Sequence, residues 1–297
     1  MLNVSLAILT TVTMVAAADA PEGRCEVNVS VRTITHGPKA HWFGYYDKLQ
    51  FDPTGRYVLG MEVDFEQRSP TADDVVRLGF VDLEDGDTWT EFGASRAWGW
   101  QQGCMLQWLP GSKTKAIYND RDGDHFVAVI QDVFTGEKQR LPRPIYTVSP
   151  DGKHAAGLNF ARVQRTRPGY GYKGVEDSGK DDPHPADDGI YLMDLETGAS
   201  RLLFSLEEIA QVPAPKPLPG HHWFNHLLFN TDGTRFIFLH RAFLNEENKG
   251  PWVTRMFTAS TQGKALHCVA DHGMVSHFIW RNPRQILAWS HEPETGN

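Results

Sequence analysis

Two residues around one predicted turn could carry proton-transfer chemistry. Tyr146 precedes a Ser-Pro-Asp-Gly turn at 149–152, and Arg162 follows that turn at the end of the segment NFAR, interpreted as a strand. Across such a hairpin the two side chains approach each other, and a neighbouring guanidinium lowers the pKa of a phenol. A phenol with a lowered pKa can serve as an acid or a base. We therefore predict a catalytic site that contains Tyr146 and Arg162.

Aromatic, amide and basic residues elsewhere in the chain could bind a sugar. The segment 41–51, HWFGYYDKLQF, joins a histidine and a carboxylate to aromatic rings, which stack on sugar faces. The segment 98–108, WGWQQGCMLQW, is either core or sugar-binding surface. The loop 163–174 is either a solvated basic loop or a site for a carboxylate or sulfate. The predicted substrate-binding residues are Trp42, Tyr45, Gln102, Arg165, Arg167, Tyr170 and Tyr172.

Histidines gather in the last part of the chain and suggest a metal site. Of the 13 histidines, eight lie between positions 221 and 291. Nitrogen and sulfur ligands on separate strands can assemble a metal site on a rigid scaffold. The alternative is that each histidine is an ordinary satisfied polar residue. The predicted ligands of a divalent metal (Zn, Mn or Ca, structural or catalytic) are His226, His240, Cys268 and His277.

A repeated pair of turns predicts the elements that position these residues. Each first turn is followed by a β-rich segment and then by a second turn, and glycine and aspartate supply the backbone conformations that tight hairpins need. The two turn glycines are 25 to 31 residues apart in three units and 46 apart in the third unit, which contains an insertion. The glycine pairs are Gly55 and Gly86, Gly111 and Gly136, Gly152 and Gly198, and Gly233 and Gly263. Each unit is therefore interpreted as four short antiparallel strands, the blade of a β-propeller.

The repeat predicts an all-β fold with four complete blades and part of a fifth. Segment 26–34 alternates as a strand does and could close the ring, whereas the polar ending at 292–297 indicates a chain truncated at its carboxyl end. One helix is predicted at 205–212, where Ser205 and Glu208 form a capping box before a proline-rich stop. The complete blades cover about 42–93, 104–142, 145–205 and 223–271, and the fifth begins at 275–291.

Composition excludes several classes of protein and partner. The chain has 297 residues, 40% of them hydrophobic, which argues against fibrous and disordered proteins. With 29 Lys and Arg against 37 Asp and Glu, the net charge of −8 argues against nucleic acid or an anionic membrane as the main partner. An anionic polysaccharide or oligosaccharide needs only a few local cations and stays compatible with this charge.

The amino-terminal segment predicts export. Residues 4–18 are apolar and Ala-Asp-Ala follows at 18–20, so we expect a signal peptide at 1–20 and a single propeller domain at 21–297. An amino-terminal anchor or a buried helix is the alternative. No other segment approaches the roughly 20 apolar residues of a membrane span. A secreted or periplasmic protein follows, and its three cysteines are too few for a disulfide scaffold.

These segments resemble known propeller families. The Ser-Pro-Asp-Gly turns resemble those of TolB-like propellers, and 145–163 resembles the part of ulvan lyases that carries an active-site tyrosine and arginine. Segments 224–243 and 253–280 resemble the region of oligogalacturonate lyases that carries metal-binding histidines. The resemblance implies a ring of seven blades, of which two or more would lie outside this chain.

The resemblance also implies a reaction, the β-elimination of a 4-linked uronate. The C6 carboxylate is neutralised, the C5 proton is removed and the departing O4 is protonated. Carried onto this sequence, Arg162 neutralises the carboxylate, Tyr146 transfers a proton, and His41 is a second acid or base or a positioning residue. Two other functions stay open. One is a non-catalytic TolB-like propeller that binds glycan or protein, and the other is a hydrolase that would use two carboxylates.

Overall fold

The computed structural model describes residues 30–291. The chain divides into two units, 1–33 and 34–297, and every strand and helix described below lies in the second unit. The predicted signal peptide at 1–20 lies outside the described residues, as do residues 26–29 of the candidate closing strand. The described remainder of that segment, 30–34, is not part of a strand.

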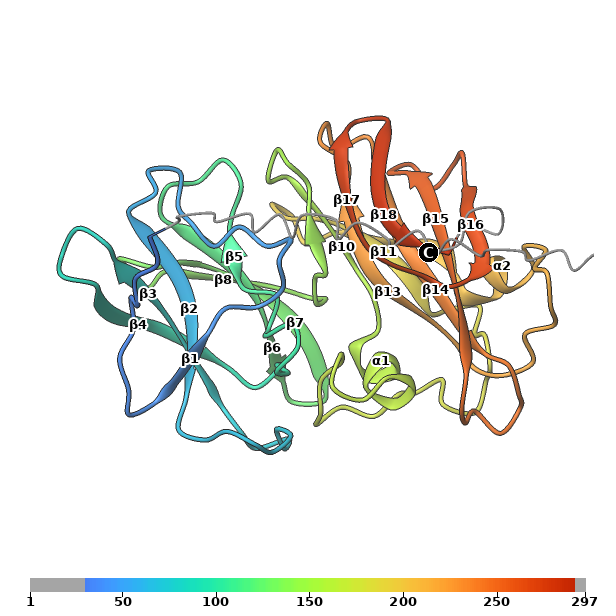
Figure 1. Ribbon diagram of the computed structural model, residues 1–297, viewed down its shortest axis with the longest axis horizontal. Helices are drawn as coiled ribbons and strands as arrows, with labels where there is room; N and C mark the ends of the chain where they lie inside the picture. Colours follow the sequence, from blue (N-terminus) through green and yellow to red (C-terminus); the bar gives the residue numbers. More distant parts are fainter. Residues whose placement is uncertain (1–29, 292–297) are drawn as a thin grey trace, which may run out of the picture. The chain divides into compact units, whose positions relative to one another are not determined.

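The first two blades form where the repeat predicts them. Each is a four-stranded antiparallel sheet whose strands pair in sequence order, as Figure 1 shows in blue and green. The first contains β1 (Ala40–Trp42), β2 (Tyr57–Val63), β3 (Val76–Asp82) and β4 (Thr88–Ser95). The second contains β5 (Gln107–Trp108), β6 (Lys115–Asp122), β7 (His125–Asp132) and β8 (Lys138–Leu141).

The remaining sheets repeat this pattern, so the predicted β-propeller fold is confirmed. The third blade contains β9 (Thr147–Val148), β10 (His154–Gly157), β11 (Gly189–Asp194) and β12 (Ser200–Ser205). The fourth contains β13 (His222–Phe229), β14 (Arg235–Phe243), β15 (Trp252–Ser260) and β16 (His267–Gly273). A two-stranded sheet, β17 (Val275–Asn282) with β18 (Gln285–Ser290), follows as the predicted partial fifth blade.

Two short helices interrupt the strands. The predicted helix is present as α2 (Leu206–Ala210), and Ser205 and Glu208 form the expected capping box. A second helix, α1 (Phe160–Thr166), occupies the segment interpreted as a strand and loop, so that interpretation is wrong. The side chain of Asn159 accepts hydrogen bonds from the first helical N–H groups, a capping signal in the sequence. Neither helix has the length or the apolar character needed to cross a membrane.

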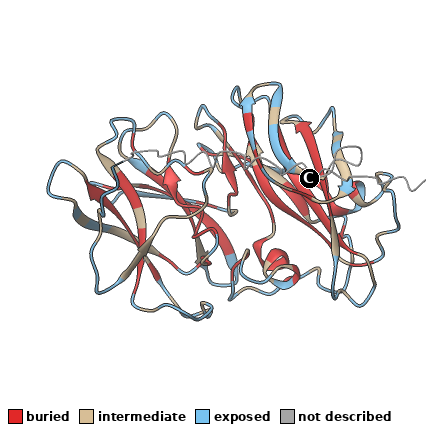
Figure 2. Ribbon diagram, in the orientation of Figure 1, coloured by how far each residue is buried: buried red, intermediate tan, exposed pale blue. Residues whose placement is uncertain are grey.

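The hydrophobic core lies between neighbouring blades. One cluster joins the first and second blades through side chains such as Leu78 and Trp108. A larger cluster joins the second, third and fourth blades and includes Ala156 and Phe236. Figure 2 shows buried residues concentrated on the strands and exposed residues on the connections. The strands therefore form a rigid scaffold for their connecting segments.

The turns between the first and second strands of the second to fifth blades contact their neighbours. A Cβ at Gly152, in the turn of the third blade, would collide with the carbonyl oxygen of Pro110 in the turn of the second. In the fourth blade, Asn230 Nδ2 donates a hydrogen bond over 3.1 Å to the carbonyl oxygen of Pro283 in the fifth. We call these turns, with that of the first blade, the turn end of the blades; they lie at 52–55, 109–112, 149–152, 230–233 and 282–285.

Candidate functional site

The first strands of several blades are irregular a few residues before the turn end. Met105, His226 and His277 have positive φ values of 58°, 50° and 30°, four or five residues before the turn of their own blade. The register of β13 shifts after Asn225, and that of β17 shifts after Ser276. Such bulges redirect side chains and cluster at functional sites. In the first blade, 43–48 interrupts the corresponding strand between β1 and the bridge at Phe51.

His226 and side chains near the irregular positions of the second and fourth blades meet around the hydroxyl group of Tyr146. This tyrosine is 1% exposed. Its oxygen accepts a 2.6 Å hydrogen bond from Gln102 Nε2 and lies 3.2 Å from Asn225 Oδ1 and 3.1 Å from His226 Nδ1. The second, third and fourth blades therefore each contribute to one buried polar cluster, which we call the Tyr146 cluster: Gln102, Tyr146, Asn225 and His226.

Hydrogen bonding in the Tyr146 cluster bears on which nitrogen of His226 carries its proton. Asn225 Oδ1 accepts a 2.9 Å hydrogen bond from the backbone N–H of His226, which identifies this atom as the amide oxygen. We assign the Tyr146 proton to Asn225 Oδ1, and with this assignment His226 Nδ1 carries the proton that it shares with the Tyr146 oxygen; Gln102 Nε2 lies 3.4 Å from the same nitrogen. Nε2 of His226 is left with a lone pair, and it makes no hydrogen bond within residues 30–291.

Burial and nearby cations keep His226 neutral. Desolvation lowers its pKa well below the ordinary value, and Arg241, Lys48, His277 and Arg167 lower the pKa further by charge repulsion. The imidazole is therefore neutral at neutral pH, and in the assigned tautomer Nε2 carries the lone pair. Burial raises the pKa of Tyr146 well above its ordinary value, so the expectation of a lowered pKa is wrong.

Two arginines beside the Tyr146 cluster have no anionic partner. Arg241, on β14, is 7% exposed, and its buried Nε has no hydrogen-bond partner. Arg167, after α1, also has an unpartnered Nε, and its guanidinium lies 4.8 Å from the Tyr170 ring centroid. Burial lowers the pKa of Arg241, and repulsion from Arg167 lowers it further. Within the described chain neither guanidinium forms an ion pair, an arrangement suited to a bound anion.

The segment 45–48 adds a third cation and connects the site to the fifth blade. Lys48 Nζ lies 2.9 Å from Asp47 and 5.2 Å from the ring centroid of Tyr146. The Tyr46 hydroxyl donates to the carbonyl oxygen of Phe278 and accepts from its N–H. The charged groups here are thus the carboxylate of Asp47 and three cations, Lys48, Arg167 and Arg241. The local charge is therefore positive.

Two further tyrosine rings lie beside that of His226. The ring centroids of Tyr45 and Tyr170 lie 5.2 and 5.9 Å from that of His226. The Tyr45 hydroxyl makes no hydrogen bond to the described residues, and burial raises its pKa. It therefore stays protonated and can donate to a ligand. The structure brings together five of the predicted site residues, namely Tyr45, Gln102, Tyr146, Arg167 and Tyr170, together with His226, which was predicted as a metal ligand.

Arg162 lies apart from the Tyr146 hydroxyl because helix α1 directs it elsewhere. Its guanidinium is 1% exposed and donates to the backbone carbonyl groups of Gly179, Asp182, Pro183 and His222. It therefore ties the inserted loop to β13 and has no group left for a substrate carboxylate. The missed helix explains the difference, because a strand at this position would have carried Arg162 along the hairpin.

Other predicted residues belong to structural contacts. His41 Nε2 lies 3.0 Å from Glu62 in a charged group on the first blade. Arg165 pairs with Asp177, and the buried Tyr172 hydroxyl accepts a hydrogen bond from Asn119. Trp42 packs at a tilt against Trp98 and Trp100.

The predicted metal ligands do not converge. Both ring nitrogens of His240 are occupied, since Nε2 lies 2.9 Å from His222 Nδ1 and Nδ1 accepts from Arg255. Cys268 Sγ contacts the carbonyl oxygen of Ala270. In residues 30–291, no group of three or more His, Cys, Asp or Glu side chains is arranged to hold a metal ion. The four-ligand site that the spacing suggested is therefore not formed.

Two adjacent residues of β14 face different parts of the structure. His240 and Arg241 are adjacent on β14, so their side chains point to opposite faces of the sheet. His240 faces His222, whereas Arg241 lies beside Arg167 and the tyrosines of the site. Asn225 and Lys48 were also missed, although the first adjoins the predicted His226 and the second lies within the aromatic segment 41–51.

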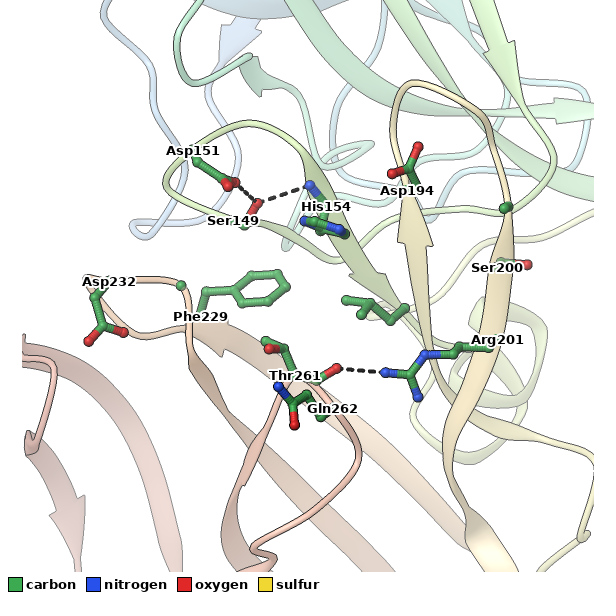
Figure 3. Close-up of a pocket in the computed structure, with 13 residues that line it drawn as sticks. Ser149, Asp151, His154, Asp194, Ser200, Arg201, Phe229, Asp232, Thr261 and Gln262 are labelled. Carbon is green, nitrogen blue, oxygen red and sulfur yellow. Dashed lines mark hydrogen bonds between the residues drawn. The ribbon is translucent and has the colours of Figure 1, made fainter.

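A pocket of about 540 Å³ lies at the turn end, between the third and fourth blades (Figure 3). It is lined by Ser149, Asp151 and Asp232 from the first turns and by Asp194, Thr261 and Gln262 from the second turns. The hydroxyl and carboxylate groups of Ser149 and Asp151 are hydrogen-bonded to each other. None of the residues of the Tyr146 cluster lines this pocket.

Comparisons with known proteins agree with the fold. No family model and no curated protein matches the sequence. A solved oligogalacturonate lyase from Vibrio parahaemolyticus has a TM-score of 0.52 and 13% identity, over 83% of this chain and 58% of that one. An oligogalacturonate lyase in complex with manganese has a TM-score of 0.44 and 13% identity, over 89% and 75% of the two chains. A putative TolB from Agrobacterium tumefaciens has a TM-score of 0.44 and 14% identity, over 81% and 65%.

At this level of identity, the likeness to the Vibrio protein shows a shared β-propeller fold and does not show a shared activity. This chain spans less than three fifths of that protein's length.

Proposed function

We propose that this protein is a polysaccharide lyase that cleaves an anionic, uronate-containing glycan by β-elimination. The observation that carries the proposal is Arg241, a buried guanidinium without an anion, beside the neutral base His226. Burying an unpaired charge is costly, and a site that does so is prepared for a charged ligand. The likeness in fold to a solved oligogalacturonate lyase agrees with this proposal.

The arginine pair would bind the uronate carboxylate. Arg241 and Arg167 lie close enough to repel each other, and a carboxylate between them would relieve that repulsion. Neutralising the carboxylate makes the adjacent C5 proton more acidic, which is the first requirement of β-elimination. This role passes from Arg162, where the sequence placed it, to Arg241.

His226 would then remove the C5 proton with its Nε2 lone pair. The electron pair of the C5–H bond forms the C4–C5 double bond, and the C4–O4 bond breaks with its electrons on O4. Tyr45, whose phenol stays protonated beside His226, would supply the proton to O4. The products are an unsaturated uronate and a shortened chain, and no oxidant or co-substrate is required.

Tyr146 would position the base and would not touch the substrate. Its buried hydroxyl accepts from His226 Nδ1, which keeps the second ring nitrogen unprotonated. The described residues do not fit a metal site, and no step of this mechanism passes through one. The expected partner is an anionic polysaccharide or oligosaccharide, and the expected location is outside the cell or in the periplasm.

A direct test is the absorbance of unsaturated products from a panel of 4-linked uronate polymers. We expect the protein to cleave at least one polymer. Arg241→Gln and His226→Gln are each expected to lower kcat/KM by about 100-fold or more, because each removes a group that acts on the transition state. Arg140→Gln is the matched control, since Arg140 is an exposed arginine paired with Asp122.

The outcome also separates the lyase from the alternative of a binding protein. Binding of uronate oligosaccharides that depends on Arg241, with no cleavage of any polymer, would replace the lyase by a non-catalytic glycan-binding propeller. Cleavage that survives both substitutions would refute the assignment of these residues.

A further inference from the structure

The three tryptophans near the start of the second blade differ in their surroundings. Trp98 and Trp108 are buried and belong to the core between the first two blades. Trp100 is only partly buried and lines two pockets, of about 190 and 510 Å³. The sequence segment 98–108 is thus core at two tryptophans and accessible surface at the third.

The ring of Trp100 is held in place but has no parallel partner. Its Nε1 donates a 2.6 Å hydrogen bond to the carbonyl oxygen of Arg68. Trp42, Phe65 and Trp98 contact it at interplanar angles of 45°, 84° and 82°, so none of them stacks flat on it. A fixed indole with an uncovered face is the surface on which a sugar ring stacks.

The smaller pocket at Trp100 adjoins the proposed active site. Gly169 and Gly171 line this pocket, and Tyr170 between them contacts His226. Consecutive Cα atoms are about 3.8 Å apart, so the chain passes from the site to the pocket within one residue. Gly99 packs directly on this segment, because a Cβ there would lie 3.2 Å from the carbonyl oxygen of Gly169.

The lining of the smaller pocket suits one anionic sugar. Gln164 offers an amide for hydroxyl groups, and the exposed Lys173 forms no ion pair within the described chain. The pocket is smaller than the roughly 300–1,000 Å³ of sites for drug-sized ligands, so it fits a single ring of a chain that continues elsewhere.

We propose that the pocket formed by Trp100, Gln164 and Lys173 is a second sugar-binding subsite for an anionic glycan. It holds a uronate residue near the one bound at Arg241, with the ring on Trp100 and the carboxylate at Lys173. This inference rests on the proposed function, because it takes the same glycan as the ligand. It predicts that longer chains bind better than the shortest substrate.

The test measures cleavage and binding against chain length. Uronate oligosaccharides of two to eight residues, from a polymer that the protein cleaves, are compared by kcat/KM. Trp100→Ala is expected to lower kcat/KM about tenfold on the long oligosaccharides and to leave the shortest cleaved one unchanged. Lys173→Ala is expected to lower kcat/KM on the long oligosaccharides about threefold. Trp100→Phe, which keeps an aromatic ring, is expected to retain most of the wild-type kcat/KM.

Two controls keep the outcomes distinct. Trp289→Ala removes a 58% exposed tryptophan on β18. It is expected to leave kcat/KM unchanged both on the long oligosaccharides and on the shortest one. The binding of the same oligosaccharides to His226→Gln, titrated by intrinsic fluorescence, is expected to weaken when Trp100→Ala is added. Equal loss on short and long substrates, or unchanged binding, would overturn the subsite while leaving the lyase intact. Absence of cleavage in the wild type would contradict the proposed function instead, and the fluorescence titration, run with oligosaccharides from each polymer of the panel, would then decide the subsite alone.

Discussion

The turn end of the blades and the Tyr146 cluster lie along the same first strands, but they differ in whether their buried polar groups have hydrogen-bond partners. At the turn end, buried polar side chains are satisfied locally: Asp52 accepts from the N–H groups of Thr54 and Tyr57, and Asn230 accepts from that of Arg235. Near the Tyr146 cluster, buried polar atoms lack partners on Asp47, Gln102, Arg167, Asn225 and Arg241.

Within one strand, the side chains that stabilise the fold are therefore different from the side chains that are available for function. A satisfied side chain at the turn end stabilises its hairpin and has no capacity left for a ligand. The unpartnered groups near His226 destabilise the protein in the absence of a ligand and are available to bind one. Positive φ at His226 adds strain of about 1–3 kcal/mol at the same place. We therefore expect substitutions at the two regions to affect different measurements.

The largest expected effect is the loss of activity in Tyr146→Phe. The ring keeps its packing on Phe160, but His226 Nδ1 loses the hydroxyl that fixes its proton. We expect kcat to fall by about 100-fold, with little change in KM, in steady-state assays of unsaturated product. Tyr118→Phe is the matched control, since its buried hydroxyl donates to Gln131 in the second blade. An equal fall in both variants would mean that general loss of packing, and not His226, limits the rate.

The second effect is on stability and comes from the turn end. Asn230→Ala removes the acceptor for the Arg235 N–H and the donor to the carbonyl oxygen of Pro283. We expect the free energy of unfolding in urea to fall by about 1–3 kcal/mol, with kcat/KM unchanged in the folded protein. Thr231→Ala, at an exposed position of the same turn, is expected to have little effect. If Asn230→Ala lowered kcat as much as Tyr146→Phe does, the separation of the two regions would be wrong.

The turn end was predictable from sequence because its signals are local. Glycine at a positive φ and a side chain that accepts from nearby N–H groups leave a motif within a few residues, and this motif placed the four complete blades of residues 30–291 correctly. The capping box of α2 is equally local. The cap at Asn159 was a similar signal, but the expected strand after Gly152 obscured it.

The site was predictable only in part because it depends on contacts between blades. Tyr146 and His226 come from different blades, and no spacing in the sequence shows that they share a hydrogen bond. His240 and Arg241 occupy opposite faces of β14, and the histidine count favoured His240, which faces His222 and not the Tyr146 cluster. Arg162 was misplaced by the missed helix. The types of residue in the sequence indicated which chemistry is possible. The location of the site became visible only from the packing of neighbouring blades.

The smallest expected effect tests whether the fifth blade belongs to the site. His277 is exposed and contributes to lowering the pKa of His226. His226 acts as a base only when neutral, so activity falls as pH drops through its pKa, below the ordinary value of about 6.5. Removing the charge of His277 in His277→Gln should raise the pKa of His226 and move the acid limb of kcat/KM to higher pH.

His272→Gln is the control for this last substitution, because His272 is an exposed histidine beside Asp271 and is not among the main groups that lower the pKa of His226. The measurement is kcat/KM from pH 4 to pH 8 for both variants. If the acid limb of kcat/KM moved to lower pH in His277→Gln, the repulsion inferred between His277 and His226 would be wrong in sign. A limb that does not move would show that the charge of His277 does not reach His226. In that case the contact of Tyr46 with Phe278 would be structural only, and the functional site would end at the fourth blade.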